Sequence, residues 1–283
     1  MPRKVASSEW IDLPIISEFE YSISMSKLSL NLPSNWQHTH LSSTDSTMLR
    51  LRDKAYARVA EEFVLLTADY QSAGRGQRGT SWEADAEQNL LFGFLFHPVK
   101  VNAMHQFSLS EALALAVCEC LSAYDEGFSV KWPNDVYWHE RKICGMLLEH
   151  DLQGSHIATT LTGVGVNVNQ QTFRSNAPNP VSLKQITGNN VDRAVLLENI
   201  LNRFQSYYRQ LQSGDYQSLH TAYMQRLYRR EGVHSFEDSE GSFSASIENI
   251  SPLGMLTLQR EDGSQRTYAF KEVKFVVPSS KER

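Results

Sequence analysis

The segment formed by residues 74–82 restricts the fold of this chain more than any other part of it. It places three glycines, Arg75, Arg78 and Trp82 between two apolar runs, Phe63–Ala68 and Leu90–Phe96. Glycines let a backbone turn tightly and approach a ligand, and arginines supply planar donors for carboxylate and phosphate groups. Glycine–arginine runs also occur in solvated or RNA-binding tails. A run between two buried strands instead favours a loop that closes over an anionic small molecule.

The composition is typical of a soluble globular protein with one large and one small domain, since the 283 residues are 41% hydrophobic and 21% charged. A net charge of −5 argues against general attraction to nucleic acid. We find no stretch of about 20 apolar residues and no apolar signal sequence, so we expect a cytoplasmic protein without a membrane span. Cys118, Cys120 and Cys144 lack the spacing of a disulfide framework, and Cys118 and Cys120, within an apolar helix pattern, are expected to be buried thiols.

The order of apolar runs and turn signals predicts an α+β fold with a mixed or antiparallel sheet and helices. Residues 42–47 have the hydroxyl and carboxyl side chains of a helix start. The helix expected over 105–124 is apolar on nearly all sides and should be buried. Strands are expected over 63–68, 88–96, 128–132, 135–138, 142–150 and 156–168, with later helices over 192–212 and about 215–230.

The last 50 or so residues differ in character from the rest. Short alternating segments over 242–250, 253–260, 265–270 and 273–277, separated by turn signals, predict a small β-barrel. We therefore expect an N-terminal extension over residues 1–40, a catalytic domain over 41–230 and a C-terminal barrel over 231–283. The extension is too short for a helix-turn-helix domain, so DNA binding is not expected.

Three further motifs follow the glycine–arginine segment. Residues 131–135 are Lys-Trp-Pro-Asn-Asp, residues 141–145 are Arg-Lys-Ile-Cys-Gly, and residues 163–169 are Gly-Val-Gly-Val-Asn-Val-Asn. In this order the motifs resemble those of biotin protein ligases, in the short form without a DNA-binding domain, over about residues 41–280. The resemblance implies a catalytic domain like that of class II synthetases and an SH3-like C-terminal barrel.

The resemblance also implies a reaction. Biotin would be activated with ATP to biotinyl-5'-AMP, with Mg²⁺ present, and then transferred to a lysine of the biotin carboxyl-carrier domain of a carboxylase or decarboxylase. The resemblance does not decide whether the protein is a monomer or a homodimer. Two alternatives remain: a lipoate ligase or octanoyl transferase of related fold, whose arginine-glycine-histidine signature is not found, and a ligand-sensing regulator, for which a DNA-reading element is missing.

Lys142 is the strongest candidate for a catalytic residue. Joining a carboxylate to a phosphate brings two anions together, so a fixed positive charge is needed where they meet. Lys142 opens a predicted strand, and Gly145 nearby leaves space for a ligand beside the ammonium group. A hairpin-turn lysine is the alternative from local sequence, but the adjoining motif at 131–135 argues against it. Lys131 is expected to be a strand-edge lysine.

The arginines of the glycine-rich segment supply further charge for the carboxylate and the phosphates. The resemblance assigns Arg75 to the acyl phosphate, as a second catalytic residue. Gln77 and Thr80 stand where the family often has arginines, so phosphate contacts there are in doubt, and Arg78 compensates in part. The resemblance places Trp82 over the adenine side, with plain core packing as the alternative.

The motif at 131–135 also supplies oxygen and amide groups. Pro133 fixes its own φ and holds Trp132 extended, which presents Asn134 and Asp135 as rigid side chains. Asp135 is expected to hold Mg²⁺, because this ion prefers hard oxygen ligands, and Asn134 to contact the phosphate or nucleotide. A turn-forming Asn-Asp pair is the alternative.

Asn167 and Asn169 occupy alternate positions of one predicted strand and therefore should lie on one face. The resemblance places Asn167 near the nucleotide, and Asn169 is a weaker candidate. With these residues the ATP-binding set is Arg75, Arg78, Trp82, Asn134, Asp135, Lys142 and Asn167.

A biotin pocket needs a few fixed hydrogen bonds for the ureido ring and an apolar lining for the bicyclic body. Met48 stands where the family often has asparagine, so one ureido contact is expected from the backbone or not at all. Ser46 could equally cap a helix. The biotin-binding set implied by the resemblance is Ser46, Thr47, Gln71, Gly74, Arg75, Trp132, Lys142 and Gly145.

Overall fold

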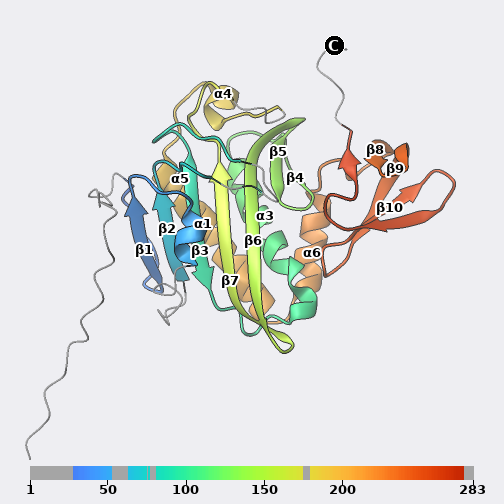
Figure 1. Cartoon of the computed structure of the whole chain (residues 1–283), viewed down its shortest axis with the longest axis horizontal. Coiled ribbons are helices and arrows are strands. Elements are labelled where there is room, and N and C mark those ends of the chain that lie inside the picture. Colours follow the sequence, from blue (N-terminus) through green and yellow to red (C-terminus); the bar gives the residue numbers. More distant parts are fainter. Residues whose placement is uncertain (1–27, 53–62, 75, 77–80, 175–178, 277–283) are drawn as a thin grey trace, which may run out of the picture.

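The computed structural model describes residues 28–52, 63–74, 76, 81–174 and 179–276, and it contains two sheets with helices packed beside them (Figure 1). The larger sheet has seven strands in the order β1-β2-β3-β7-β6-β5-β4. Its strands are parallel between β1 and β2 and antiparallel elsewhere. The mixed sheet predicted from the sequence is therefore present. The strands are β1 Trp36–Leu41, β2 Phe63–Ala68, β3 Leu90–Phe96, β4 Phe128–Lys131, β5 Asp135–Trp138, β6 Arg141–Gln153 and β7 His156–Val166.

Three helices cover one face of this sheet: α3 (Phe107–Leu121), α5 (Arg193–Gln212) and α6 (Tyr216–Gln225) (Figure 1). The main core lies between them and the sheet, and α3 is buried on nearly all sides, as its composition predicts. The short helix α1 (Thr47–Leu51) packs on the opposite face over a smaller apolar cluster. Two short elements complete this part, a 3₁₀ turn η2 (Ala103–His105) and α4 (Leu183–Thr187).

The C-terminal region forms a separate five-stranded antiparallel sheet in the order β11-β10-β9-β8-β12. The predicted barrel is not confirmed, because the described residues form an open sheet with β11 and β12 at its edges. The strands are β8 His234–Asp238, β9 Gly241–Ile250, β10 Leu256–Arg260, β11 Gln265–Tyr268 and β12 Lys274–Phe275.

Two boundaries differ from those expected. Strand β1 belongs to the large sheet, so residues 36–40, expected in the N-terminal extension, pair with β2. The helix predicted to reach residue 230 ends at Gln225. The chain after it pairs with the outer strand β4: Val130 N donates to Arg226 O at 2.7 Å, and Tyr228 N donates to Val130 O at 2.8 Å. The backbone groups of the edge strand β4 gain hydrogen-bond partners in this way. These bonds compensate for the helical hydrogen bonds that are lost when α6 ends at Gln225.

Cys118 and Cys144 are buried free thiols, and Cys120 is a partly buried one. Within the described part of the chain, no helix has the length and apolar character needed to cross a membrane.

The C-terminal sheet docks on the part of the chain that holds the large sheet, through the turn before β10. Trp132 Nε1 donates to Gly254 O at 3.0 Å, and Phe107 N donates to Pro252 O at 3.2 Å. The Trp132 ring also meets the Phe270 ring edge-on, with 6.1 Å between the centroids. Gly254 has a φ of +84°, and a Cβ atom there would lie 2.6 Å from Phe107 Cδ2. The contact therefore needs a residue without a side chain at this position.

We predict that Gly254→Ala destabilises the protein more than Gly263→Ala does. Gly263 has a similar φ of +81°, but a Cβ atom there would meet no other atom within 4 Å, so it controls for backbone strain. The extra loss for Gly254→Ala should be about 1–3 kcal/mol, the usual cost of overpacking. Urea unfolding of both variants measures it. Equal losses would show that Phe107 does not restrict this turn.

Two part-buried histidines make stability sensitive to acid. Burial, assisted by His40, lowers the pKa of His38 to about 4. Burial likewise lowers the pKa of His150 to about 4. Each ring contacts a threonine hydroxyl. His38 Nε2 lies 2.8 Å from Thr67 Oγ1, and His150 Nδ1 lies 2.9 Å from Thr160 Oγ1. In the unfolded chain both rings would titrate near 6.5.

The sign of the pH effect follows from these values. Between pH 6.5 and 4 these two histidines bind more protons in the unfolded state, so their contribution to the free energy of unfolding falls as pH falls and is constant below pH 4. We predict that His38→Gln with His150→Gln flattens this decline by at least about 1 kcal/mol, after allowing for solvent screening of part-buried rings.

The matched control is His220→Gln. Its hydrogen bond with Glu111 raises the pKa of His220, so its contribution is complete below pH 6.5 and is lost at higher pH. Urea unfolding at several pH values checks both variants. A decline that is unchanged in the double variant would contradict the assignment.

Candidate active site

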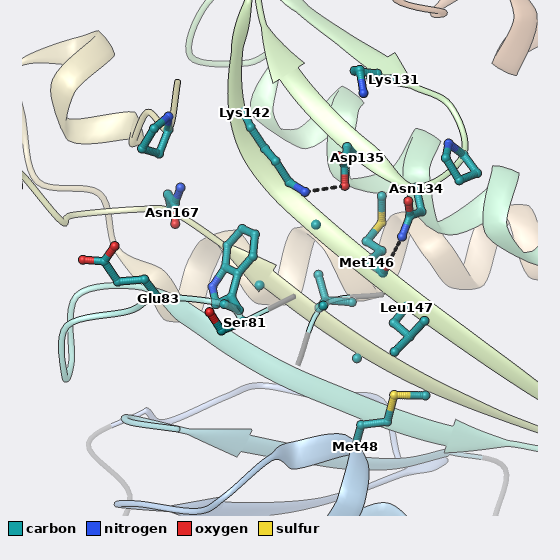
Figure 2. Close-up of a pocket in the computed structure, with 18 of the residues that line it drawn as sticks. Met48, Ser81, Glu83, Lys131, Asn134, Asp135, Lys142, Met146, Leu147 and Asn167 are labelled. Atoms are coloured by element: carbon teal, nitrogen blue, oxygen red, sulfur yellow. Dashed lines mark hydrogen bonds and ion pairs between the residues drawn. The ribbon is translucent and has the colours of Figure 1, made fainter. Parts of the chain in front are cut away.

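A pocket of about 590 Å³ opens on the large sheet over β5, β6 and β7, on the side that carries α1 (Figure 2). Segments far apart in the sequence meet here, including the start of α1, the chain after β2 and two residues of the C-terminal region. Most of the predicted site residues line it: Ser46, Thr47, Gln71, Trp82, Trp132, Asn134, Asp135, Lys142, Gly145 and Asn167.

The floor of the pocket is a strip of strand without side chains. Gly145 of β6 and Gly165 of β7 are paired across the two strands, and Gly163 follows on the same face. A Cβ atom at Gly165 would lie 2.4 Å from Trp82 Cε2, and one at Gly145 would lie 3.0 Å from Trp82 Cζ3 and 3.3 Å from Lys142 Nζ. The Trp82 indole can therefore lie on this strip only because both positions are glycine.

Trp82 forms a wall of the pocket and is fixed by Gly74. Trp82 N donates to Gly74 O at 2.9 Å, and a Cβ atom at Gly74 would lie 2.9 Å from Trp82 O. Gly74 thus positions the tryptophan and does not itself line the pocket. The indole Nε1 is buried without a hydrogen-bond partner, and Lys142 Nζ lies 5.8 Å from the ring centroid.

Lys142 points into the pocket and forms an ion pair with Asp135, with 2.7 Å between Nζ and Oδ1 (Figure 2). Its backbone is held on both sides, because Lys142 N donates to Asn179 O and Val181 N donates to Lys142 O, each at 2.9 Å. The ammonium and carboxylate groups are partly exposed, so an anionic ligand can reach them. Asp135 therefore aligns the lysine that the sequence identified.

A metal site made by the protein alone is not present in the described residues, where no three or more His, Cys, Asp or Glu side chains converge. Asp135 is a single carboxylate already engaged by Lys142. A Mg²⁺ ion here would need most of its oxygen ligands from a phosphate-bearing ligand and water.

Lys131 is a second lysine of the pocket and not a solvated strand-edge residue. Its Nζ lies 5.2 Å from the Tyr137 ring centroid and 5.0 Å from that of Phe275. Burial lowers the pKa of Lys131, and the nearby Asp135 carboxylate opposes this effect. Lys131 and Lys142 together make this end of the pocket suited to anions.

The asparagines have different surroundings. The Asn134 side-chain amide donates to the Met146 carbonyl, so part of it is used to hold β6 (Figure 2). Asn167 Nδ2 donates to Val181 O at 3.1 Å, while its Oδ1 is buried without a partner. Asn169 lies outside the pocket lining, and its side chain exchanges two hydrogen bonds with the Val191 backbone. The shared-face prediction for Asn167 and Asn169 is wrong because β7 ends at Val166.

The other end of the pocket carries hydroxyl and amide groups. Ser46 is the N-cap residue of α1, but its side chain makes no capping hydrogen bond. Gln71 reaches the helix start instead, accepting a hydrogen bond from Thr47 N at 2.7 Å. The Ser46 hydroxyl is therefore not used by the helix. Met48 follows and lies beside Gly163, so this end of the strip is bordered by a thioether.

Some lining residues were not predicted. Phe270 and Lys271 reach the pocket from the C-terminal region, where no sequence motif predicts a role for them. Arg75 and Arg78, together with Gln77 and Thr80, lie outside the described residues. The remaining additional lining residues are Met48, Gly76, Ser81, Glu83, Lys131, Pro133, Tyr137, Met146, Leu147, Gly163, Val164, Gly165, Phe173 and Pro180.

Comparison with known proteins gives a consistent result. Residues 41–167 match the biotin/lipoate A/B protein ligase family. The chain is 29% identical to biotin–[acetyl-CoA-carboxylase] ligase from Paracoccus denitrificans, over 80% of this chain and 95% of that protein. It is 26% identical to the bifunctional ligase/repressor BirA of Bacillus subtilis, over 82% of this chain and 71% of that protein.

Among solved structures, the fold is similar to that of biotin protein ligase from Aquifex aeolicus in complex with biotin and ATP. The TM-score is 0.69, the sequence identity is 27%, and the match covers 84% of this chain and 99% of that chain.

We predict that Gly165→Ala moves the Trp82 indole and that Gly163→Ala does not. The new methyl group at 165 meets the indole ring, whereas at 163 it meets the flexible Met48 side chain at 3.4 Å. The measurement is ¹⁹F NMR of protein labelled with 5-fluorotryptophan, with the Trp82 signal assigned by Trp82→Phe. An unshifted Trp82 signal in Gly165→Ala would contradict this packing.

Proposed function

We propose a two-step reaction for this chain, which belongs to the biotin/lipoate A/B protein ligase family and is a biotin protein ligase. In the first step biotin and ATP form biotinyl-5'-AMP and pyrophosphate. In the second step the biotinyl group passes to a lysine of the biotin carboxyl-carrier domain of a carboxylase or decarboxylase, and AMP leaves. The observation that supports this most directly is the aligned Lys142–Asp135 pair at the head of a glycine-floored slot.

The slot suits biotin in size and in the order of its groups. The carboxylate would lie beside Lys142, and the apolar bicyclic body would lie in the pocket beside Gly163, next to the Trp82 indole that covers Gly145 and Gly165. The neutral ureido ring would reach the polar end, where Ser46 supplies a hydroxyl that α1 does not use. A mostly apolar pocket with a few fixed polar groups is typical of small-molecule sites.

Activation joins two anions, and Lys142 is placed to reduce their repulsion. A carboxylate oxygen of biotin attacks the α-phosphorus of ATP, the bond from that phosphorus to the bridging oxygen breaks, and pyrophosphate departs. The Lys142 ammonium stabilises the charge that develops at phosphorus. Arg75 is proposed to add a second charge to the acyl phosphate, and Arg78 to contact the nucleotide.

Asp135 keeps the Lys142 side chain pointing into the pocket until the substrates bind, because the ion pair fixes the direction of a long flexible side chain. If Mg²⁺ enters with the nucleotide, Asp135 would be the protein carboxylate that holds it, and the ion would screen the phosphate charges. Asn134 and Asn167 would contact the nucleotide through groups not engaged by the backbone. The free Asn167 Oδ1 supports this role.

In the transfer step the mixed anhydride must survive until the acceptor arrives. The Trp82 indole packed on glycine limits water access to this part of the slot. The neutral amine of the acceptor lysine attacks the acyl carbon, the carbon–oxygen bond to AMP breaks, and the amine proton passes to solvent or a base. We propose that the C-terminal sheet corresponds to the family's SH3-like module and contributes Phe270 and Lys271 to this stage.

The remaining expectations are part of the same proposal. We propose a cytoplasmic enzyme that acts without binding DNA. A homodimer is compatible with the reaction.

Intact-mass spectrometry tests the proposed function. The full chain is incubated with ATP, Mg²⁺, biotin and a biotin carrier domain, and in parallel with lipoate and a lipoyl domain. We expect biotin addition to the carrier, abolished when its target lysine is replaced by arginine. Modification of the lipoyl domain alone would identify a lipoate ligase, and modification of neither would overturn the proposal.

We predict that Lys142→Ala slows biotinyl-AMP formation by roughly 10²–10³-fold, the usual cost of removing one preorganised charge-stabilising group. Lys142→Arg should restore little, since a planar fork does not replace a compact ammonium group. Rapid quenching and chromatography of the adenylate measure the rate.

Lys274→Ala is the control, because Lys274 is exposed and pairs with Glu237 in the C-terminal sheet. A loss below tenfold in Lys142→Ala, with biotin still bound, would remove Lys142 from the reaction.

A further inference from the structure

The pocket wall formed by Gln71 and Trp82 is held by two arms of chain. The first arm, residues 69–74, leaves the end of β2, and the second arm, residues 81–89, leads into β3. The two arms are joined by backbone hydrogen bonds, since Trp82 N donates to Gly74 O at 2.9 Å and Glu87 N donates to Asp69 O at 3.0 Å. The position of the wall therefore depends on what fixes the far ends of the arms.

One side chain reaches both far ends. Arg193, the first residue of α5, donates through Nη1 to Asn89 O at 3.1 Å. The same Nη1 lies 3.5 Å from Asp69 Oδ1. Asp69 begins the first arm, and Asn89 closes the second. A single guanidinium group thus bridges the residues where the two arms meet the sheet.

The bridge has an electrostatic basis. Asp69 is buried, and its Oδ1 has no hydrogen-bond partner, so the nearby Arg193 charge compensates for it. The other carboxylate oxygen, Oδ2, meets His40 Nε2 of β1 at 3.0 Å. Removing Arg193 would leave half of a buried carboxylate without a counter-charge, which is costly in a site with little water.

Arg193 is itself held rigidly. Its helix begins at Asp192, whose carboxylate accepts hydrogen bonds from Ala194 N at 2.8 Å and Val195 N at 3.2 Å. The Arg193 side chain is only 14% exposed. It does not line the pocket, so any effect on ligand binding must pass through the arms.

A second tie acts on the returning arm alone. Gln170 Oε1 accepts hydrogen bonds from Asp85 N at 3.0 Å and from Asn89 Nδ2 at 2.5 Å. Asn89 Oδ1 in turn accepts from Val168 N at 2.9 Å. The second arm is thereby fixed to the chain that follows β7, next to Asn167. Arg193 connects this tie to Asp69 on the first arm.

We propose that Arg193 is a positioning residue for the ligand pocket: its guanidinium sets the spacing of the two arms and so the placement of Gln71 and Trp82. This inference rests on the proposed function for the identity of the ligand, biotin. Arg193 touches neither the substrates nor Lys142. Its loss should therefore weaken binding of biotin while leaving the rate of the chemical step at saturating biotin nearly unchanged.

The test uses Arg193→Met in the full chain, which keeps the apolar stem and removes the donors and the charge. Arg203→Met is the matched control, because Arg203 is on the same helix but pairs with Glu119, away from both arms. Calorimetry gives the Kd for biotin, and kcat and KM come from adenylate formation. We expect Arg193→Met to raise Kd and KM by about tenfold or more, the equivalent of losing one charged hydrogen bond, with kcat changed less than about threefold.

Acrylamide quenching of Trp82, obtained as the difference from Trp82→Phe in each background, supplies a readout without ligand. Quenching should rise in Arg193→Met and stay at the parent value in Arg203→Met. Arg193→Lys tests the bridge if the methionine variant fails to fold, because lysine keeps the positive charge but its shorter side chain does not reproduce the position of Nη1 between Asp69 Oδ1 and Asn89 O. Arg193→Lys should give a Kd for biotin between those of the parent and Arg193→Met.

The outcomes separate the two proposals. A parent that binds no biotin overturns the proposed function, while the quenching comparison still decides the role of Arg193. Parent-like Kd and quenching in Arg193→Met overturn the positioning role. Equal losses in Arg193→Met and Arg203→Met, or a fall in kcat with KM unchanged, also overturn it, because they indicate general destabilisation or a direct part in the reaction.

Discussion

The pairing of Gly145 with Gly165 is the contact on which the rest of the site depends. Glycines at three positions on one face of two neighbouring strands, Gly145 of β6 and Gly163 and Gly165 of β7, create a slot in the sheet. The slot admits a flat ring, and in this structure it carries the Trp82 indole. The same absence of a side chain at Gly145 leaves room for the Lys142 ammonium. Gly145 therefore contacts both the Trp82 indole and the Lys142 side chain, and a methyl group added there would displace both.

Charge in the pocket is arranged around Asp135. Its carboxylate pairs with Lys142 at 2.7 Å, and it also opposes the burial effect on the pKa of Lys131. A ligand that brings carboxylate and phosphate groups offers these lysines further partners. The ion pair therefore keeps the pocket stable before binding and leaves its positive charge available to substrates. The C-terminal sheet supports this arrangement through the bond from Trp132 Nε1 to Gly254 O.

Sequence alone could predict the parts of this molecule that depend on local pattern. Buried apolar runs located β2, β3 and α3, and the motifs located Lys142, Asp135 and Gly145 in one pocket. Strand β1 escaped prediction because its sequence, WQHTHL, mixes polar and apolar residues. His40 is buried in it only because Asp69 and Thr67 from the next strand and the chain just after it supply polar partners.

Other features depend on long-range packing that no local pattern records. Phe270 and Lys271 reach the pocket because the C-terminal sheet docks beside Trp132, and the sequence shows no motif for that docking. Asn169 was misplaced because the end of β7 is set by pairing with β3 and β6. The closed barrel was expected from short alternating strands, but alternation predicts strands and not how the edges of their sheet meet.

Pyrophosphate exchange into ATP measures whether this pocket activates the carboxylate of biotin, as we propose. The full chain is incubated with labelled pyrophosphate, ATP and Mg²⁺, with biotin, lipoate or no acid. We expect rapid exchange that requires biotin and is not supported by lipoate. Exchange that is absent with biotin, or equally fast with lipoate, would contradict it.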